Sequence, residues 1–284
     1  MIASLRAEVV RLGRWPTTWI IVGVWLVLNL TFGYLFSYLS YRSGSGGGFA
    51  DEVPDGGAAA LLEQMAPASV PEAMVAGLPM FGGALLITLG ALAVGSGYGW
   101  GTWKTVFTTG LRRSRVLGGT LGALGLVLAV VVALTLAFDL LAAFAVASAE
   151  SQPATWPTLA DTARGVGAAL LIGGMWLAGG VLLGTLTRGP ALAVGLGLVW
   201  ALVVENLLRG AAGLLDGLET VTDLLPGTAA GSVVGALGVL TQSEPNGTPG
   251  VMTVLSGATA AVLLGGYIAV FLGASTVLTA RRDV

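Results

Sequence analysis

The sequence predicts an all-α protein that crosses a membrane six times, with an amphipathic helix at its start. Hydrophobic residues make up 55% of the 284 residues, and charged residues make up only 10%. A soluble domain carries about a quarter charged residues, so this chain has more apolar surface than one globular core can hide. Apolar runs near or beyond 20 residues recur, and each is about long enough to cross a bilayer as a helix. We treat residues 1–284 as a single transmembrane domain.

The first 16 residues predict a helix that lies in the membrane interface. Arginines flank an apolar stripe at helical spacing, and Pro16 breaks the helix before the first long apolar run. The stripe consists of Ile2, Leu5, Val9 and Leu12. A frayed cytosolic tail is the alternative. The segment is not expected to be a cleavable signal, because the apolar run after Trp15 is too long and no small-residue cleavage site follows it.

Six apolar runs are expected to span the membrane. They are residues Thr18–Leu39, Leu78–Gly95, Val116–Val146, Gly165–Leu186, Pro190–Leu208 and Gly257–Thr279. The third run is too long for one upright crossing, so it should tilt, project beyond the bilayer, or end in a separate short helix. Only "TRGP" separates the fourth and fifth runs, and its Gly and Pro predict a tight turn.

Lysine and arginine placement predicts that both termini lie in the cytoplasm. The predicted inner segments hold Arg6, Arg11, Arg14, Lys104, Arg112, Arg113, Arg115, Arg188, Arg281 and Arg282, whereas the outer segments hold Arg42, Arg164 and Arg209. Cytoplasmic loops of membrane proteins carry such an excess of basic residues. Trp15, Trp19, Trp100, Trp103 and Trp156 lie near span ends and are interpreted as interfacial anchors.

Two long segments, 41–77 and 209–256, are expected outside the cytoplasm. The first begins with "RSGSGGG", a flexible linker composition, and continues into a predicted short helix at Ala58–Met65. The second holds apolar stretches that acidic residues and Pro226 interrupt. We expect short helices that enter the outer leaflet and return, with protein covering their backbone. A pair of additional spans is the alternative.

The loop between the second and third spans is basic and aromatic. The stretch "SGYGWGTWKTVFTTGLRRSR" contains one lysine and three arginines but no acidic residue. Trp103, Val106, Phe107 and Leu111 recur at helical spacing and predict an apolar face. Aromatic side chains ringed by arginine are typical of protein interfaces. The alternative is a basic loop that follows the positive-inside rule and lies on lipid headgroups.

With these features in hand, the chain resembles the type-2 ATP-binding-cassette (ABC) exporter permeases of bacteria. Those proteins have Glu-aromatic-x-x-Gly-Thr after the second span and Ser-Arg at the start of the third. Here Tyr98, Gly101 and Thr102 match the first motif, and Ser114 with Arg115 matches the second. "ARRDV" at residues 280–284 is similar to the family's usual ending, and "LLPGTAAG" at 224–231 to a Leu-Pro segment before the last span. Two positions depart from the pattern. The usual Glu is Gly97, and a Lys frequent in the third span is Thr120.

The resemblance implies that loop 97–115 holds a coupling helix seated in a groove of a cytosolic ATPase. The residues expected to couple are Gly101, Thr102, Trp103, Lys104, Val106, Phe107, Leu111, Arg112, Arg113, Ser114 and Arg115. It also implies two ATPase subunits, a second copy of the permease or a paralogous permease, membrane lipids and no nucleic acid as partners. The expected location is the bacterial cytoplasmic membrane. Drugs, lipids, peptides and polysaccharides are the cargo classes of such exporters.

No nucleotide or metal chemistry is expected in this chain. It lacks the Gly-x-x-x-x-Gly-Lys-Ser/Thr pattern, and Lys104 is its only lysine, so ATP and Mg²⁺ are expected on the partner ATPase. Cys and His are absent, which removes thiolate ligands and the commonest general base. An ion-coupled secondary transporter, which should show an internal repeat and midplane ionisable residues, is the first rival function. A membrane enzyme and a scaffold are less favoured rivals.

Asp139 and Glu205 are the two carboxylates inside the predicted spans. An intramembrane acid is a candidate functional residue by default, and both fall toward the outer side, where they would line an exit path for a cationic or amphipathic substrate. The alternative is interfacial placement, with Glu205 paired to Arg209 one helical turn later. Asn29 and Asn206 are interpreted as links between helices. Gly118/Gly122, Gly180/Gly184 and Gly231/Gly235 predict close helix packing.

Overall fold

The computed structural model describes residues 2–43, 57–108, 110, 112–212, 218–244 and 247–281. Within these ranges the chain forms helices joined by turns, and no strand occurs. Six helical stretches are long and apolar enough to cross a membrane, which confirms the predicted all-α polytopic fold. They are Pro16–Ser43, Pro67–Gly99, Arg113–Ala149, Leu159–Thr187, Pro190–Ala212 and Gly257–Arg281.

Three of the spans are single α-helices and three are composite. The single ones are α8 (Arg113–Ala149), α9 (Leu159–Thr187) and α14 (Gly257–Arg281). The composite ones are α2 (Pro16–Leu30), η1 (Thr31–Leu35) and α3 (Phe36–Ser43); η2 (Pro67–Ser69), α5 (Val70–Ala76), η3 (Leu78–Gly82) and α6 (Gly83–Gly99); and α10 (Pro190–Leu198), η4 (Val199–Val204) and α11 (Glu205–Ala212). Outside the spans lie α1 (Ile2–Arg14), α4 (Gly57–Gln64), α7 (Thr102–Thr108), α12 (Leu218–Asp223) and α13 (Pro226–Gly235).

Each composite span contains a π-helical segment, namely η1, η3 or η4. At η3 the Gly82 amide donates to the Gly77 carbonyl at 2.9 Å, a bond between residues five apart. Pro79 lies within this turn and has no amide hydrogen to donate, so the wider turn accommodates it without ending the helix. The second span therefore begins at Pro67, eleven residues before the predicted start. The predicted short helix at Ala58–Met65 is confirmed as α4.

The third span is one uninterrupted helix. α8 contains 37 residues, so it is about 55 Å long at 1.5 Å per residue, compared with a hydrocarbon core of about 30 Å. The alternative of a separate helix at its outer end is therefore wrong. The next span, α9, ends at Arg188, whose backbone adopts a left-handed conformation (φ 54°), and α10 starts two residues later at Pro190. The tight turn predicted from "TRGP" is confirmed.

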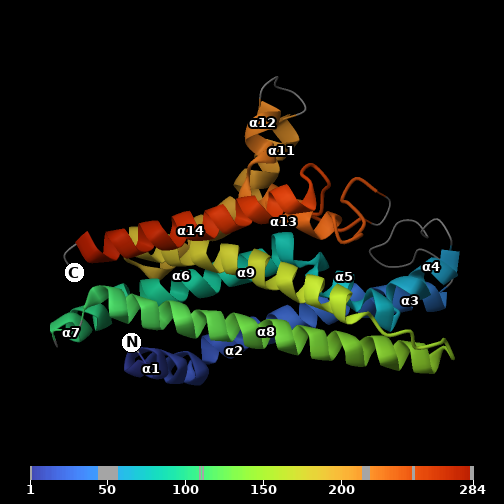
Figure 1. Ribbon diagram of the computed structural model, residues 1–284, viewed down its shortest axis with the longest axis horizontal. Helices are drawn as coiled ribbons and strands as arrows, with labels where there is room; N and C mark the ends of the chain where they lie inside the picture. The colour runs from blue at the N-terminus through green and yellow to red at the C-terminus, as the bar shows by residue number, and fades with distance from the viewer. Residues whose placement is uncertain are drawn as a thin grey trace.

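The spans form a bundle in which α6 and α9 are the most buried and α14 the least (Figure 1). Glycines allow α6 and α9 to approach closely. A Cβ added at Gly180 would lie 2.1 Å from the Ile87 carbonyl oxygen, and one at Gly90 would lie 2.3 Å from that of Leu177. The close packing predicted for Gly180 and Gly184 is therefore an interaction within this chain.

The N-terminal helix α1 packs along the start of α8. Ser4 and Leu5 fill the space left by Gly119 and Gly122, and Leu12 is fully buried. Ile2 and Val9, from the same predicted stripe, are exposed instead, so only part of the stripe contacts the bundle. An exposed apolar edge on a basic helix is what an interfacial helix presents to lipid.

The segment before the last span contains short helices and no additional crossing within residues 218–244 and 247–256. α13 has ten residues, and Pro226 through Val234 are all buried, so protein covers this helix as predicted. The chain then turns back past it, where the Met252 amide donates to the Gly231 carbonyl at 3.3 Å. Figure 1 shows α11 and α12 projecting from the bundle beside α13.

α7 lies at the same end of the bundle as α1 and the C-terminal end of α14, whereas α3 and α4 lie at the opposite end (Figure 1). An even number of spans separates α1 from α7 and from the C-terminal end of α14, so all three are expected at the same end. The predicted inner basic residues of these elements are therefore gathered at one end of the molecule. Arg282 and the rest of "RDV" lie outside the described residues.

Candidate functional site

The short helix α7 is held against α6 by Trp103. Its indole Nε1 donates to the Val94 carbonyl at 3.1 Å, and its ring stacks on Phe107 with centroids 5.6 Å apart. The Tyr98 ring also lies next to the indole, tilted, with centroids 6.0 Å apart. Gly101, with φ 68°, makes the turn from α6 into α7, a conformation that favours glycine. These contacts fix the orientation of α7 relative to α6.

Gly97 is the residue that makes room for Trp103. A Cβ at position 97 would lie 2.3 Å from Trp103 Nε1 and 2.7 Å from another indole atom. No side chain fits there while the indole occupies this place. The glycine at position 97 and the buried Trp103 are therefore two parts of one arrangement.

The structure corrects the expected role of Trp103 as an exposed anchor. Its side chain is only 6% exposed and belongs to the chain's own core, and Val106 and Phe107 pack against that core. The apolar face of α7 is directed inward because the end of α6 offers an apolar surface next to it. The exposed residues of α7 are polar: Thr102, Lys104, Thr105 and Thr108. Leu111 lies outside the described residues.

The basic residues after α7 open α8. Arg112 adopts an extended conformation immediately before the helix, and Arg112, Ser114 and Arg115 are exposed. Arg113 lies over the Phe107 ring, with its guanidinium carbon 5.5 Å from the centroid, which connects α7 to α8. Five of the predicted coupling residues thus lie exposed at this end of the bundle, namely Thr102, Lys104, Arg112, Ser114 and Arg115, and three of them carry a positive charge.

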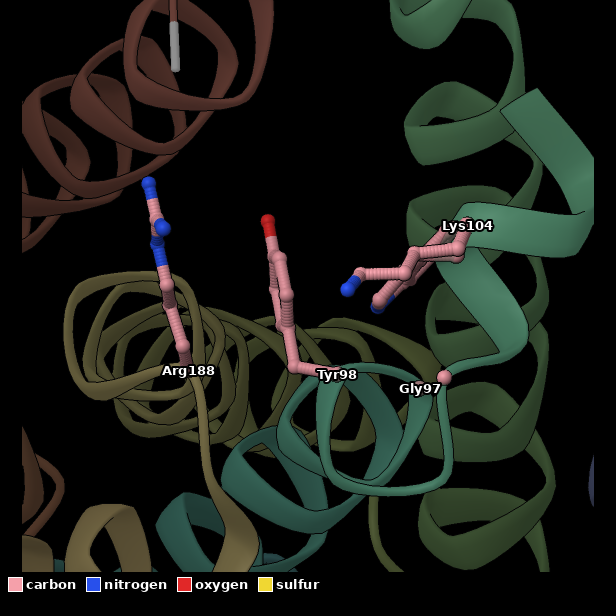
Figure 2. A pocket seen from close by; sticks show the side chains of 6 residues that line it. Gly97, Tyr98, Lys104 and Arg188 are labelled. Atoms are coloured by element: carbon pink, nitrogen blue, oxygen red, sulfur yellow. The ribbon is translucent and has the colours of Figure 1, made fainter. Parts of the chain in front are cut away.

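A cavity of about 190 Å³ opens beside α7. It is lined by Gly97, Tyr98, Gly101, Trp103, Lys104 and Arg188. Figure 2 shows the side chains of Tyr98, Lys104 and Arg188 extending into the same space from three different elements. Sequence reasoning missed this cavity because Arg188 lies far along the chain, in the α9–α10 turn.

Asp139 is fully buried between α8 and the first span. Asn29 donates from Nδ2 to Asp139 Oδ1 at 2.7 Å, and one turn earlier Trp25 donates to the Thr135 hydroxyl at 2.9 Å. Asp139 is 0% exposed, so its carboxyl group is enclosed by this chain. The predicted role of Asn29 as a link between helices is confirmed. Asp139 Oδ2 and the Tyr34 hydroxyl are buried and have no hydrogen-bond partner among the residues that the structure describes.

The same helix pair carries a second polar contact near its end. Tyr38 and Tyr41 donate their hydroxyls to the two Glu150 carboxylate oxygens at 2.9 and 3.1 Å, and Arg42 lies 3.6 Å from the same carboxylate. These residues lie more than a hundred positions apart in the sequence, so no local sequence pattern could predict the contact. We name the contacts of residues 25, 29, 38, 41 and 42 with residues 135, 139 and 150 the polar seam.

Glu205 does not pair with Arg209 as the sequence spacing predicted. The carboxylate accepts hydrogen bonds from Trp200 Nε1 at 2.8 Å and from the Gly227 backbone amide in the first turn of α13. Arg209 instead donates to the Glu205 carbonyl at 3.2 Å and to Asn206 at 3.1 Å. The Glu205 side chain is 1% exposed, so this chain encloses it as well. Asn206 bonds within its own helix rather than between helices.

The structure does not bring the two acids into one site. Asp139 is bonded to α2 and Glu205 to α13. Among the described residues no group of three or more potential metal ligands occurs. Comparison of the chain with models of known protein families and with curated proteins found no match.

Proposed function

We propose that this chain is the transmembrane permease subunit of an ATP-driven ABC exporter. The observation that carries the proposal is α7, a short helix between the second and third spans at the end of the bundle that gathers the basic residues. Its position and the Gly-Thr and Ser-Arg motifs around it resemble the coupling element of type-2 exporter permeases. ATP and Mg²⁺ are bound by separate cytosolic ATPase subunits, and this chain supplies no catalytic residue.

The contacts of α7 suit it for transmitting force. Trp103 bonds it to α6, and the Phe107–Arg113 contact joins it to the start of α8. A movement of α7 therefore displaces the second and third spans together, since neither contact leaves α7 free to turn alone. The exposed polar face and the arginines that follow are the surface offered to an ATPase. Charge complementarity at such a surface favours an acidic partner groove.

The permease works as a dimer, with a second copy or a paralogous permease. α14 and α10 are among the least buried spans, so they have apolar faces that lipid or a second subunit covers. ATP-driven closure of the two ATPases reorients the spans, and the substrate leaves toward the outer side. A drug, lipid, peptide or polysaccharide is the cargo. The proposed setting is the bacterial cytoplasmic membrane, with both termini in the cytoplasm.

Co-purification with a candidate ABC ATPase from the same genome tests the proposal. The Arg112→Glu/Arg115→Glu variant reverses two exposed charges on the proposed coupling surface and is expected to reduce ATPase recovery by about tenfold or more. The matched control, Arg6→Glu/Arg14→Glu, reverses two exposed charges on α1 and should recover the ATPase like the wild type. Equal recovery with both variants contradicts a docking role for α7.

A further inference from the structure

The cavity beside α7 places two cations and a hydroxyl around one space. Tyr98 comes from the end of α6, Lys104 from α7 and Arg188 from the turn between α9 and α10. In Figure 2 the Arg188 and Tyr98 side chains lie side by side, and the Lys104 side chain extends toward them from the other side of the Tyr98 ring. These three polar side chains border one cavity because the bundle brings their elements together.

The cavity has no negative charge of its own. None of its lining residues is acidic, and in the described part of the chain neither Lys104 nor Arg188 forms an ion pair. Two positive charges directed into one space repel each other unless an anion lies between them. An ammonium, a guanidinium and a phenol are together well suited to bind phosphate oxygens, because charged donors form the strongest hydrogen bonds to them.

The backbone at Arg188 supports a binding role. Its left-handed conformation (φ 54°) is unusual for a residue other than glycine, asparagine or aspartate. The next residue is a glycine, Gly189, yet the left-handed conformation falls on the arginine. This conformation ends α9 while the Arg188 amide still bonds to the Gly184 carbonyl at 3.2 Å. Strained backbone of this kind concentrates at functional sites, where it holds a side chain in place.

The residues around the cavity indicate that it lies at the level of lipid headgroups. Trp100 lies between the lining residues Tyr98 and Gly101, and it is 70% exposed. Its ring contacts Trp15, at the end of α1, with centroids 6.3 Å apart. Paired tryptophans beside an amphipathic basic helix mark the level of the membrane interface. Basic pockets between helices at this level bind anionic headgroups.

We propose that Tyr98, Lys104 and Arg188 form a binding site for the phosphate group of an anionic phospholipid. The site requires only this chain, so it does not depend on the proposed function. In that arrangement Arg188 and Lys104 neutralise the phosphate charge, and the Tyr98 hydroxyl donates to one of its oxygens. The bound lipid would join α7 to the α9–α10 turn through its headgroup.

Binding of phosphatidylglycerol to the purified full-length chain in detergent, measured by native mass spectrometry, tests the site. Lys104→Gln/Arg188→Gln is expected to weaken binding by about tenfold or more, since two charge-assisted contacts are lost. Tyr98→Phe keeps the ring contact with Trp103 and should weaken binding by about threefold. Arg6→Gln/Arg14→Gln removes the same number of charges outside the cavity and should bind like the wild type.

Inorganic phosphate and phosphatidylcholine complete the experiment. If inorganic phosphate displaces the lipid, the phosphate chemistry is supported and the soluble ion becomes the alternative source. If the lipid is retained in excess phosphate, the lipid is the source. Phosphatidylcholine bound as tightly as phosphatidylglycerol overturns the proposal. Unchanged binding by the Lys104/Arg188 variant, or an equal loss in the Arg6/Arg14 control, also overturns it, whatever the ATPase experiment shows.

Discussion

At the scale of single residues, Glu205 shows how this chain uses a charge inside a span. Its carboxylate lies at the N-terminus of α13, where it accepts from the Gly227 amide and from Trp200. The first amides of a helix lack partners within that helix, and the helix dipole favours a negative group there. Glu205 therefore holds α13 in place from the neighbouring span, a structural role that explains why this carboxylate is buried.

Removing this cap should destabilise the protein. Glu205→Ala leaves the Trp200 indole and the Gly227 amide without their acceptor, and we expect a loss of about 1–3 kcal/mol in the free energy of unfolding. Glu205→Gln keeps an acceptor oxygen and should cost less. Gly227→Ala should resemble Glu205→Ala, because a Cβ there collides with the carboxylate. Thermal unfolding in detergent measures all three, and a Gln variant as unstable as the Ala variant would contradict the capping role.

Asn29 and Asp139 should be energetically coupled. Asn29→Leu leaves a buried carboxyl group without its donor, and Asp139→Leu leaves a buried amide without its acceptor, so each change alone should cost several kcal/mol. The double variant replaces both by apolar groups and should cost clearly less than the sum. A double-mutant cycle on unfolding in detergent measures the coupling. Additive effects would show that the bond contributes nothing of its own.

The hydrogen bonds of Glu244, which lies outside the spans, predict that the structure around it becomes less stable in acid. Hydrogen bonds from the Thr241 backbone amide and then from the Thr241 side chain lower the pKa of this carboxyl from its ordinary value of 4.5. A lowered pKa in the folded state gives a stabilisation that is present above pH 4.5 and is lost as the pH falls through the folded value. Hydrogen exchange at the Thr241 amide, corrected for its intrinsic pH dependence, should therefore become less protected in acid. Glu244→Gln should show no such step.

At the scale of elements, α7 and the end of α6 behave as one unit because Gly97 and Trp103 fit each other. The sequence does not show that the Trp103 side chain fits into the space left by Gly97. The apolar spacing of α7 predicted a helix with one apolar face, and that face exists. Its direction could not be predicted, because it depends on whether the neighbouring helix has a glycine where the indole needs to lie.

Placing a glutamate at position 97, as in the permeases that the chain resembles, should therefore disturb α7. In Gly97→Glu the new Cβ occupies the place of the Trp103 indole, so either the tryptophan or the α6–α7 turn must move. We expect a loss of thermal stability of about 1–3 kcal/mol, as for overpacking in a core. Gly97→Glu/Trp103→Ala should be more stable than Gly97→Glu alone. Equal stability of these two variants would show that the two positions do not compete for space.

The α6–α9 contact depends on glycine in the same way. A Cβ at Gly180 would lie 2.1 Å from the Ile87 carbonyl oxygen, which belongs to the backbone and cannot rotate away. Gly180→Val should push the two central helices apart and reduce thermal stability more than any other substitution proposed here. Gly195→Val, on α10 with no atom within 4 Å of its Cβ position, is the matched control. A similar loss in both would mean that glycine content rather than this contact matters.

At the scale of the whole molecule, hydropathy and charge predicted the architecture. They could not predict which polar side chains form hydrogen bonds with each other. Six spans, the N-terminal helix and the covered α13 follow from local composition, because lipid tolerates only long apolar helices or protein-covered backbone. The polar seam was missed because its partners, such as Asn29 and Asp139, lie 110 positions apart. The early start of the second span was missed because a proline normally ends a helix. Here Pro67, Pro71 and Pro79 each lie in the first turn of a new helical segment, where proline is tolerated.

The two ends of the bundle differ in charge, and this predicts the orientation of the whole molecule in the membrane. The chain has no cysteine, so a single introduced thiol reports one position. Thr105 on α7 and Thr155 in the α8–α9 connection are both exposed, and α8 places them at opposite ends of the bundle. In intact cells a membrane-impermeant maleimide should label Thr155→Cys, whereas Thr105→Cys should react only after the membrane is opened. A reversed pattern would place α7 outside the cell, out of reach of any cytosolic ATPase, and the exporter proposal would fail while the helical bundle itself would stand.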